Sequence, residues 1–132
     1  MIGLDTNVVV RLVVGDDPVQ TAQARRFVDR HCTRQSPGFI NCAVLTEFVW
    51  VLAGSYGYTR SQIAEAVETL LSGSDRVMEH HDAVRACLED YRSRGADFLD
   101  ALIVHVNRAQ GCEATATFDR KAAKLDGFVR VS

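Results

Sequence analysis

Short apolar runs alternate with longer segments of helical periodicity along the whole chain. The apolar runs, typical of buried strands, cover residues 1–4, 39–40, 77–79, 114–118 and 128–131. The helical segments cover residues 7–14, 18–32, 42–52, 60–72, 82–93 and 97–110, with a short one at 119–125. Strands separated by helices pair in parallel, because a helical crossover returns the chain to the same edge of the sheet. The sequence therefore predicts an α/β fold with a mostly parallel sheet.

Capping residues mark several of the predicted helix ends. Asp17 followed by Pro18 predicts a helix start, since Asp is a favourable N-cap and Pro a favourable first helical residue. Asn41 can cap the next helix, and Thr59 with Gln62 forms a capping-box pattern before the one that follows. No repeat, linker or low-complexity segment occurs, so we expect one domain over residues 1–132.

The bulk composition excludes some classes of protein. No apolar run approaches the roughly 20 residues of a membrane span, and Asp5 interrupts the start of the chain before a signal-peptide core could form. We therefore expect a cytoplasmic protein with no membrane partner. The formal net charge of −2 gives no sign of a nucleic-acid partner. The four cysteines lack Cys-x-x-Cys spacing, and we expect them to be small, buried apolar residues.

Two of the apolar runs end in an acidic residue. Asp5 follows the first run, and Asp119 follows the run at 114–118. Open α/β sheets place their ligand sites outside the carboxyl ends of the strands, so both carboxylates are expected at a functional site. Asp119 is also a good N-cap for the short helix after it, and the two roles are compatible.

Three further acids lie on predicted helices. Asp97 and Asp100 are three residues apart and project from neighbouring positions at the start of one helix. Asp97 is either a ligand or the cap of this helix, whereas Asp100 is flanked by apolar residues and is interpreted as functional. Glu47 lies in a helix that is apolar on nearly all sides, which predicts a buried carboxylate that binds a metal or pairs with a core arginine. The apolar stripe of the helix at 97–110 is expected to consist of Leu99, Leu102, Ile103, Val106 and Ala109.

If these acids converge, something positive has to stabilise the cluster. Two carboxylates about 5 Å apart repel by roughly 3 kcal/mol at an effective dielectric of about 20. Ligand sets made only of oxygen suit hard divalent cations, so the sequence favours a site for Mg²⁺ or Mn²⁺, with one or two ions. Thr6, Asn7 and Thr117 could orient the carboxylates, although turn and cap chemistry accounts for each of them as well.

Other polar residues give weaker signals. His105 lies beside the apolar stripe of its helix and is interpreted as a packed histidine. No dinucleotide-binding, P-loop or nucleophile-elbow motif occurs, which removes those three classes of protein. Several arginines are candidates for phosphate contacts, although a solvated helix surface explains each of them as well. These arginines are Arg11, Arg92, Arg94, Arg108 and Arg120.

Four motifs occur in one order along the chain: Leu4-Asp5-Thr6-Asn7-Val8, the apolar helix with Glu47, the segment Ala96-Asp97-Phe98-Leu99-Asp100-Ala101-Leu102-Ile103, and Thr117-Phe118-Asp119. This ordered set, which extends over essentially the whole sequence, resembles the PIN-domain ribonucleases and most closely the VapC-type toxins of bacterial toxin–antitoxin pairs. The resemblance implies a three-layer α/β/α sandwich and a divalent-metal-dependent endoribonuclease that hydrolyses RNA phosphodiester bonds. It also implies a homodimer that a cognate antitoxin protein silences.

The resemblance also assigns roles to individual residues. The family's metal-ligand and catalytic positions match Asp5, Glu47, Asp100 and Asp119, with Asp97 matching an additional acid of close relatives. The positions that support the acidic site match Thr6, Asn7 and Thr117. None of the four main acids departs from the family pattern.

Two other functions remain open on the sequence. A Mg²⁺-dependent phosphatase or receiver-like domain would need an Asp-x-Asp motif after the first strand, which this chain lacks. The second is a non-catalytic RNA- or protein-binding module with a PIN-like fold. That alternative predicts that neutralising Asp5 or Asp100 leaves function intact.

Overall fold

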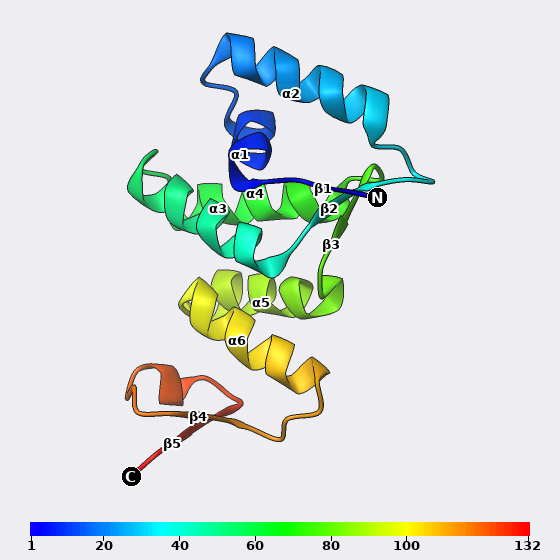
Figure 1. Ribbon diagram of the computed structural model, residues 1–132. Coiled ribbons are helices and arrows are strands. Elements are labelled where there is room, and N and C mark those ends of the chain that lie inside the picture. The colour runs from blue at the N-terminus through cyan, green and yellow to red at the C-terminus, as the bar shows by residue number, and fades with distance from the viewer. The chain divides into compact units, whose positions relative to one another are not determined.

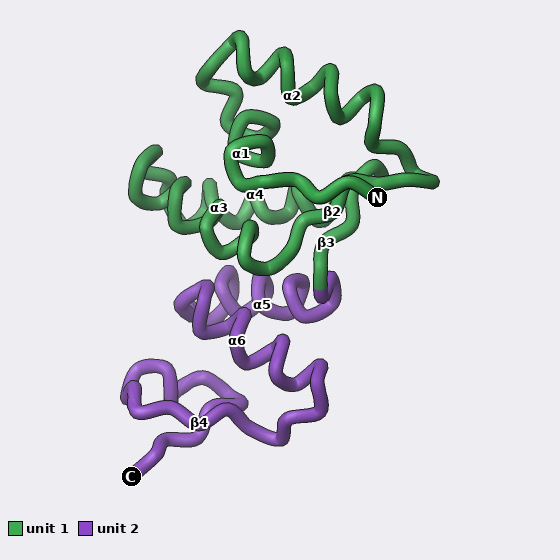
Figure 2. The backbone as a smooth tube through the Cα atoms, viewed as in Figure 1, with its two compact units in different colours: residues 1–79 green, residues 80–132 purple.

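The computed structural model describes residues 1–132, which divide into two compact units, residues 1–79 and residues 80–132 (Figure 2). The first unit contains β1 (Ile2–Gly3), α1 (Thr6–Val14), α2 (Pro18–His31), β2 (Gly38–Ile40), α3 (Cys42–Gly54), α4 (Arg60–Ser72) and β3 (Arg76–Met78) (Figure 1). The second unit contains α5 (His81–Ser93), α6 (Phe98–Ala109), β4 (Thr115–Thr117), the 3₁₀ helix η1 (Ala122–Lys124) and β5 (Phe128–Arg130). The predicted alternation of strands and helices is confirmed.

All strand pairings are parallel. The first unit has one sheet in the order β1-β2-β3, with Ile2 opposite Gly38 and Ile40 opposite Met78. The second unit has a two-stranded sheet in which Thr115 of β4 lies opposite Phe128 of β5. The predicted α/β class is therefore confirmed, and each unit carries its own parallel sheet.

The core of the first unit is built from the inward faces of its helices and strands. Val9, Leu45, Phe48, Leu52 and Val67 are fully buried, and each such side chain contributes about 1.5–3 kcal/mol through burial. Figure 1 shows α1 and α2 together on one side of the strands of this unit.

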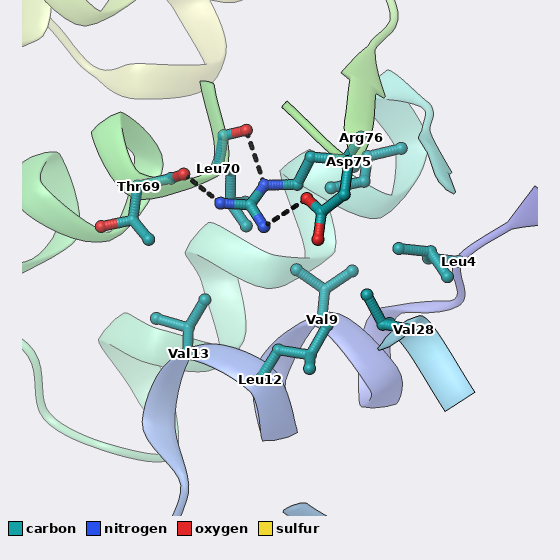
Figure 3. A pocket seen from close by; sticks show the side chains of 10 residues that line it. Leu4, Val9, Leu12, Val13, Val28, Thr69, Leu70, Asp75 and Arg76 are labelled. Atoms are coloured by element: carbon teal, nitrogen blue, oxygen red, sulfur yellow. Dashed lines mark hydrogen bonds and ion pairs between the residues drawn. The ribbon is translucent and has the colours of Figure 1, made fainter. Parts of the chain in front are cut away.

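A cavity of about 40 Å³ remains in the first unit (Figure 3). Apolar side chains line most of it, among them Leu4 and Val9. One wall holds Arg76, whose guanidinium donates to the backbone carbonyls of Thr69 and Leu70 and pairs with Asp75. Arg76 thereby satisfies carbonyls at the carboxyl end of α4, where an α-helix leaves them without partners.

The core of the second unit is the contact of α5 with α6. Val84, Cys87 and Leu88 of α5 are fully buried. Tyr91 of α5 meets Phe98 of α6 edge to face, with ring centroids 5.5 Å apart. Such aromatic pairs add about 0.5–1.5 kcal/mol beyond the area they bury.

The predicted caps form as expected. The side chain of Asp17 accepts a hydrogen bond from the N–H of Gln20, and Asn41 caps α3 in the same way. Thr59 and Gln62 form both hydrogen bonds of the capping box before α4. None of the helices combines the length and the apolar character that a membrane crossing requires.

The buried face of α6 differs from the predicted stripe. Leu99 and Ile103 are 44% and 39% exposed, and Ala109 is also exposed. The residues of α6 that are buried are Phe98, Ala101, Leu102 and Val104. The helix has apolar residues on two overlapping faces, and periodicity alone did not distinguish the face that packs on α5.

Two smaller predictions also need correction. The expected helix at 119–125 is reduced to the 3₁₀ helix η1, because the Asp119 side chain takes up the first N–H groups in a tight turn. The expected burial of the cysteines holds for Cys32 and Cys87, whereas Cys42 is half-buried and Cys112 is exposed; all four are free thiols.

Candidate active site

In the first unit, Asp5 occupies the turn between β1 and α1. It is exposed, and its Oδ1 accepts a hydrogen bond from the N–H of Thr6 at 2.9 Å, so Asp5 is the N-cap of α1. Thr6 is buried beneath this turn and Asn7 is exposed. The position after a strand end was predicted, whereas the capping role was not.

Glu47 lies in the second turn of α3, and the structure corrects its predicted burial. The side chain is exposed, and no arginine of the first unit pairs with it. Trp50, three residues further along the helix, is 75% exposed. The apolar helix α3 is thus buried on only one side, through residues such as Leu45 and Phe48, and Glu47 belongs to the uncovered side.

In the second unit, Asp97 and Asp100 lie at the start of α6. Asp97 is the N-cap of this helix, since its Oδ2 accepts from the N–H of Asp100 at 3.0 Å. Burial raises the pKa of Asp100, and the negative charges of Asp97 and Asp119 raise it further, while Lys121 opposes them. The structure therefore brings these three carboxylates of the second unit into electrostatic range of one another.

Asp119 lies in the turn after β4, where neighbouring groups fix its side chain. The hydroxyl oxygen of Thr117 accepts a hydrogen bond from the N–H of Asp119 at 3.0 Å. The Oδ1 of Asp119 accepts from the N–H groups of Lys121 at 2.8 Å and Ala122 at 3.2 Å. Asp119 therefore accepts the N–H groups of the turn that leads into η1, although Lys121 occupies the N-cap position of that helix, and Thr117 contributes turn chemistry.

Three of the five predicted acids share one property. Asp5, Asp97 and Asp119 each hold a backbone N–H with one carboxylate oxygen, and the other oxygen has no hydrogen bond. A carboxylate fixed in this way keeps one oxygen available for a ligand.

None of the five predicted acids forms a salt bridge, although other acids of the chain pair with arginine. These pairs are Arg11–Asp16, Arg76–Asp75, Arg94–Asp90 and Arg108–Asp126. The five predicted acids therefore have no arginine partner, a property that they share with other exposed acids such as Asp29 and Glu113.

The five acids are divided between the two units. Asp5 and Glu47 belong to the first unit, and Asp97, Asp100 and Asp119 to the second. Within either unit, no three side chains of the His, Cys, Asp or Glu type lie close enough together to hold a metal ion by themselves.

An open pocket of about 560 Å³ lies beside Asp97 and Asp100 in the second unit. Its other charged lining residues are Arg94, Lys121, Lys124 and Asp126. Acidic and basic side chains therefore share one hollow next to the amino end of α6.

A polar cluster behind this pocket was not predicted. Asp90 of α5 is only 8% exposed, and its Oδ2 lies 2.6 Å from Nε2 of His105 on α6. Its Oδ1 accepts a hydrogen bond from Arg94 at 3.0 Å. The interpretation of His105 as a packed histidine is confirmed. Asp90 follows the inward positions Cys87 and Leu88, and that periodicity was the available signal for its burial.

The candidate phosphate-binding arginines have different surroundings. Arg11 is held by Asp16, Tyr56 and Gln20, so its guanidinium is used within the first unit. Arg94 and Arg108 each pair with an aspartate.

Comparison with known proteins agrees with this arrangement. A protein described as "VapC ribonuclease" from Aquifex aeolicus (strain VF5) is 28% identical over 130 residues, covering 98% of this chain and 94% of the relative. The family model described as "PIN domain" matches residues 2–128, which include all five acids and extend through both units. The chain belongs to the PIN domain family.

Proposed function

We propose that this protein is a divalent-metal-dependent endoribonuclease that hydrolyses RNA phosphodiester bonds and acts as the toxin of a toxin–antitoxin pair. The observation that carries the proposal is the group of three carboxylates at the amino end of α6, where burial and the charges of Asp97 and Asp119 raise the pKa of Asp100. Membership of the PIN domain family and similarity to a protein named VapC ribonuclease support it. We further propose a single PIN domain over residues 1–132, since the family match extends through both units.

The donor set fits a hard divalent cation such as Mg²⁺ or Mn²⁺. All proposed ligands are carboxylates, and hard divalent cations prefer oxygen. Asp5, Glu47, Asp100 and Asp119 would hold one or two ions, with Asp97 as a further ligand. When bound, such an ion supplies a nucleophilic water near neutral pH and neutralises the negative charge that develops on the phosphate.

Hydrogen bonds within the chain hold three of the proposed ligand side chains in place in the absence of a metal. The N–H groups at the starts of α1 and α6 hold one oxygen each of Asp5 and Asp97. Thr117 and the turn after β4 hold Asp119. Because these side chains are fixed before any ligand arrives, little conformational entropy is lost when one binds.

The proposal includes partners and a location. We propose a cognate antitoxin protein, a homodimer and a cytoplasmic location, where the RNA substrate is present. The exposed apolar side chains Leu99 and Ile103 on α6 support the dimer, because contiguous exposed apolar surface is typical of protein interfaces.

The test is RNA cleavage by the purified protein, free of other proteins, with and without Mn²⁺. Asp100→Asn removes the charge of a proposed ligand, whereas Asp29→Asn removes that of an exposed acid on α2 and serves as the matched control. We expect metal-dependent cleavage by the wild type and the Asp29→Asn variant and none by the Asp100→Asn variant. If no protein cleaves RNA and Mn²⁺ leaves the wild-type melting temperature unchanged, the alternative of a non-catalytic binding module is favoured.

A further inference from the structure

The pocket beside α6 contains the only two lysines of the chain, Lys121 and Lys124. Both are exposed, and neither forms a salt bridge. By contrast, Arg94 and Arg108 of the same unit each form a salt bridge with an aspartate. Two lysines without salt bridges therefore share a pocket with Asp97 and Asp100, and the charge of Lys121 acts on Asp100, where it opposes the larger effects of burial and of the neighbouring aspartates.

The local backbone directs both lysines to the same side of their turn. Lys121 precedes η1 and Lys124 ends it, so they are three residues apart in a 3₁₀ conformation. Side chains at this spacing eclipse one another in a 3₁₀ helix. Ala122, between them, is buried and anchors the opposite side of the turn.

The turn is held at several points, so the lysines are presented from a fixed backbone. The Asp119 side chain accepts from the N–H groups of Lys121 and Ala122. Arg108 pairs with Asp126 at 3.2 Å. Gly127 then adopts φ +100 and packs closely against Val104.

The charged side chains that line the pocket indicate the class of ligand that it can bind. Among the charged residues that line the pocket, Arg94 and Asp126 form salt bridges with residues outside the lining. The charged residues of the lining without a salt bridge are the two lysines, Asp97 and Asp100. A cation held by the acids would make this pocket positive. A chain of phosphodiesters suits such a pocket, because one phosphate can contact the lysines while the next extends to a cation held by the acids.

We propose that Lys121 and Lys124 bind the phosphate backbone of the RNA substrate next to the phosphodiester that is cleaved. This inference rests on the proposed nuclease function and adds to it the residues that hold the substrate. They act as binding residues and have no part in the chemical step.

The test is equilibrium binding of a short fluorescein-labelled single-stranded RNA in the Asp100→Asn background, measured by anisotropy over a range of salt concentrations. The Lys121→Gln/Lys124→Gln variant loses two phosphate contacts, so the slope of log K against log salt should become shallower by about 1.4. At 0.15 M salt this corresponds to roughly tenfold weaker binding. Lys121→Arg/Lys124→Arg keeps the charges and should retain the parent slope.

The matched control is Arg26→Gln/Arg30→Gln, which removes two exposed charges from α2 in the other unit. If this control and the lysine variant give the same slope, the proposal is wrong. It is also wrong if the parent binds polyglutamate but not RNA, because the pocket would then take an acidic protein segment. A second readout is cleavage by the otherwise wild-type enzyme, in which the Lys121→Gln/Lys124→Gln change should raise KM and leave kcat unchanged.

The two readouts separate the failure of this proposal from the failure of the nuclease function. Binding is measured without cleavage, so an inactive protein with a lysine-dependent slope would refute only the nuclease. An active nuclease whose salt slope and KM do not respond to the lysines would refute only the assignment of Lys121 and Lys124.

Discussion

Replacing Asp90 by Ala should destabilise the second unit strongly. Asp90 is buried and joins α5 to α6 through the 2.6 Å contact with His105, whose side chain is 14% exposed. Removing the buried carboxylate costs about 3–5 kcal/mol, because the hydrogen bonds to a charged group are lost and the imidazole of His105 stays buried without a partner. Total stabilities of domains are about 5–15 kcal/mol, so this single change removes a large fraction.

The exposed partner of Asp90 provides the internal comparison. Arg94 also contacts Asp90, but its side chain is 66% exposed. Exposed ion pairs contribute about 1 kcal/mol or less, so Arg94→Ala should have a small effect. A difference of about 2 kcal/mol or more between the two variants is therefore expected from burial alone.

Urea unfolding at neutral pH measures these differences, followed by far-UV circular dichroism for the helices of both units and by fluorescence of Trp50 for the first unit. In a chain of 132 residues, the Asp90→Ala change should lower the melting temperature by about 10 °C or more. A double-mutant cycle with His105→Ala isolates the pair. A loss below about 1 kcal/mol for Asp90→Ala, or equal losses for Asp90→Ala and Arg94→Ala, would refute the reasoning.

Three further perturbations have defined outcomes. Because burial and two neighbouring aspartates raise the pKa of Asp100, the metal-free protein loses stability as pH rises through that pKa; Asp100→Asn should raise its melting temperature at pH 7 but not at pH 3. Gly127→Ala should cost about 2 kcal/mol or more in urea unfolding, because φ is +100 and a Cβ would lie 2.5 Å from Val104; an unchanged midpoint would contradict this. Burial and Glu79 raise the pKa of Cys42 to about 11, so mass spectrometry after alkylation of the native protein at pH 8 should find Cys42 unmodified.

The sequence predicted the elements well because their signals are local. The caps at Asp17, Asn41 and Thr59 depend on side chains within three residues of the helix start, and all three form. The positions of Asp5 and Asp119 after strands were predictable for the same reason, since each follows an apolar run directly.

The mismatches arose where the answer depends on tertiary packing. The composition of α3 indicates which residues could be buried but not which side receives a partner, so Glu47 was assigned to the wrong environment; the exposed Trp50, three residues further on, belongs to the same uncovered side. The choice between two apolar faces of α6 was settled by α5, as the exposed Leu99 shows. Asp90 was missed because a buried acid becomes recognisable only with its partner, here His105, fifteen residues away in the sequence.

The capping bonds also explain how the fold carries acids that no arginine compensates. Asp5 and Asp97 lie at the amino ends of α1 and α6, where the helix dipole stabilises a negative charge by about 0.3–1 kcal/mol. Each also replaces lost hydration with a backbone N–H, as Asp119 does twice in its turn. A paired arginine would stabilise these carboxylates further, but it would occupy the oxygen atoms that a cation needs. Asp100 does not cap a helix, and burial together with the charges of Asp97 and Asp119 raises its pKa, so a bound cation would relieve both effects.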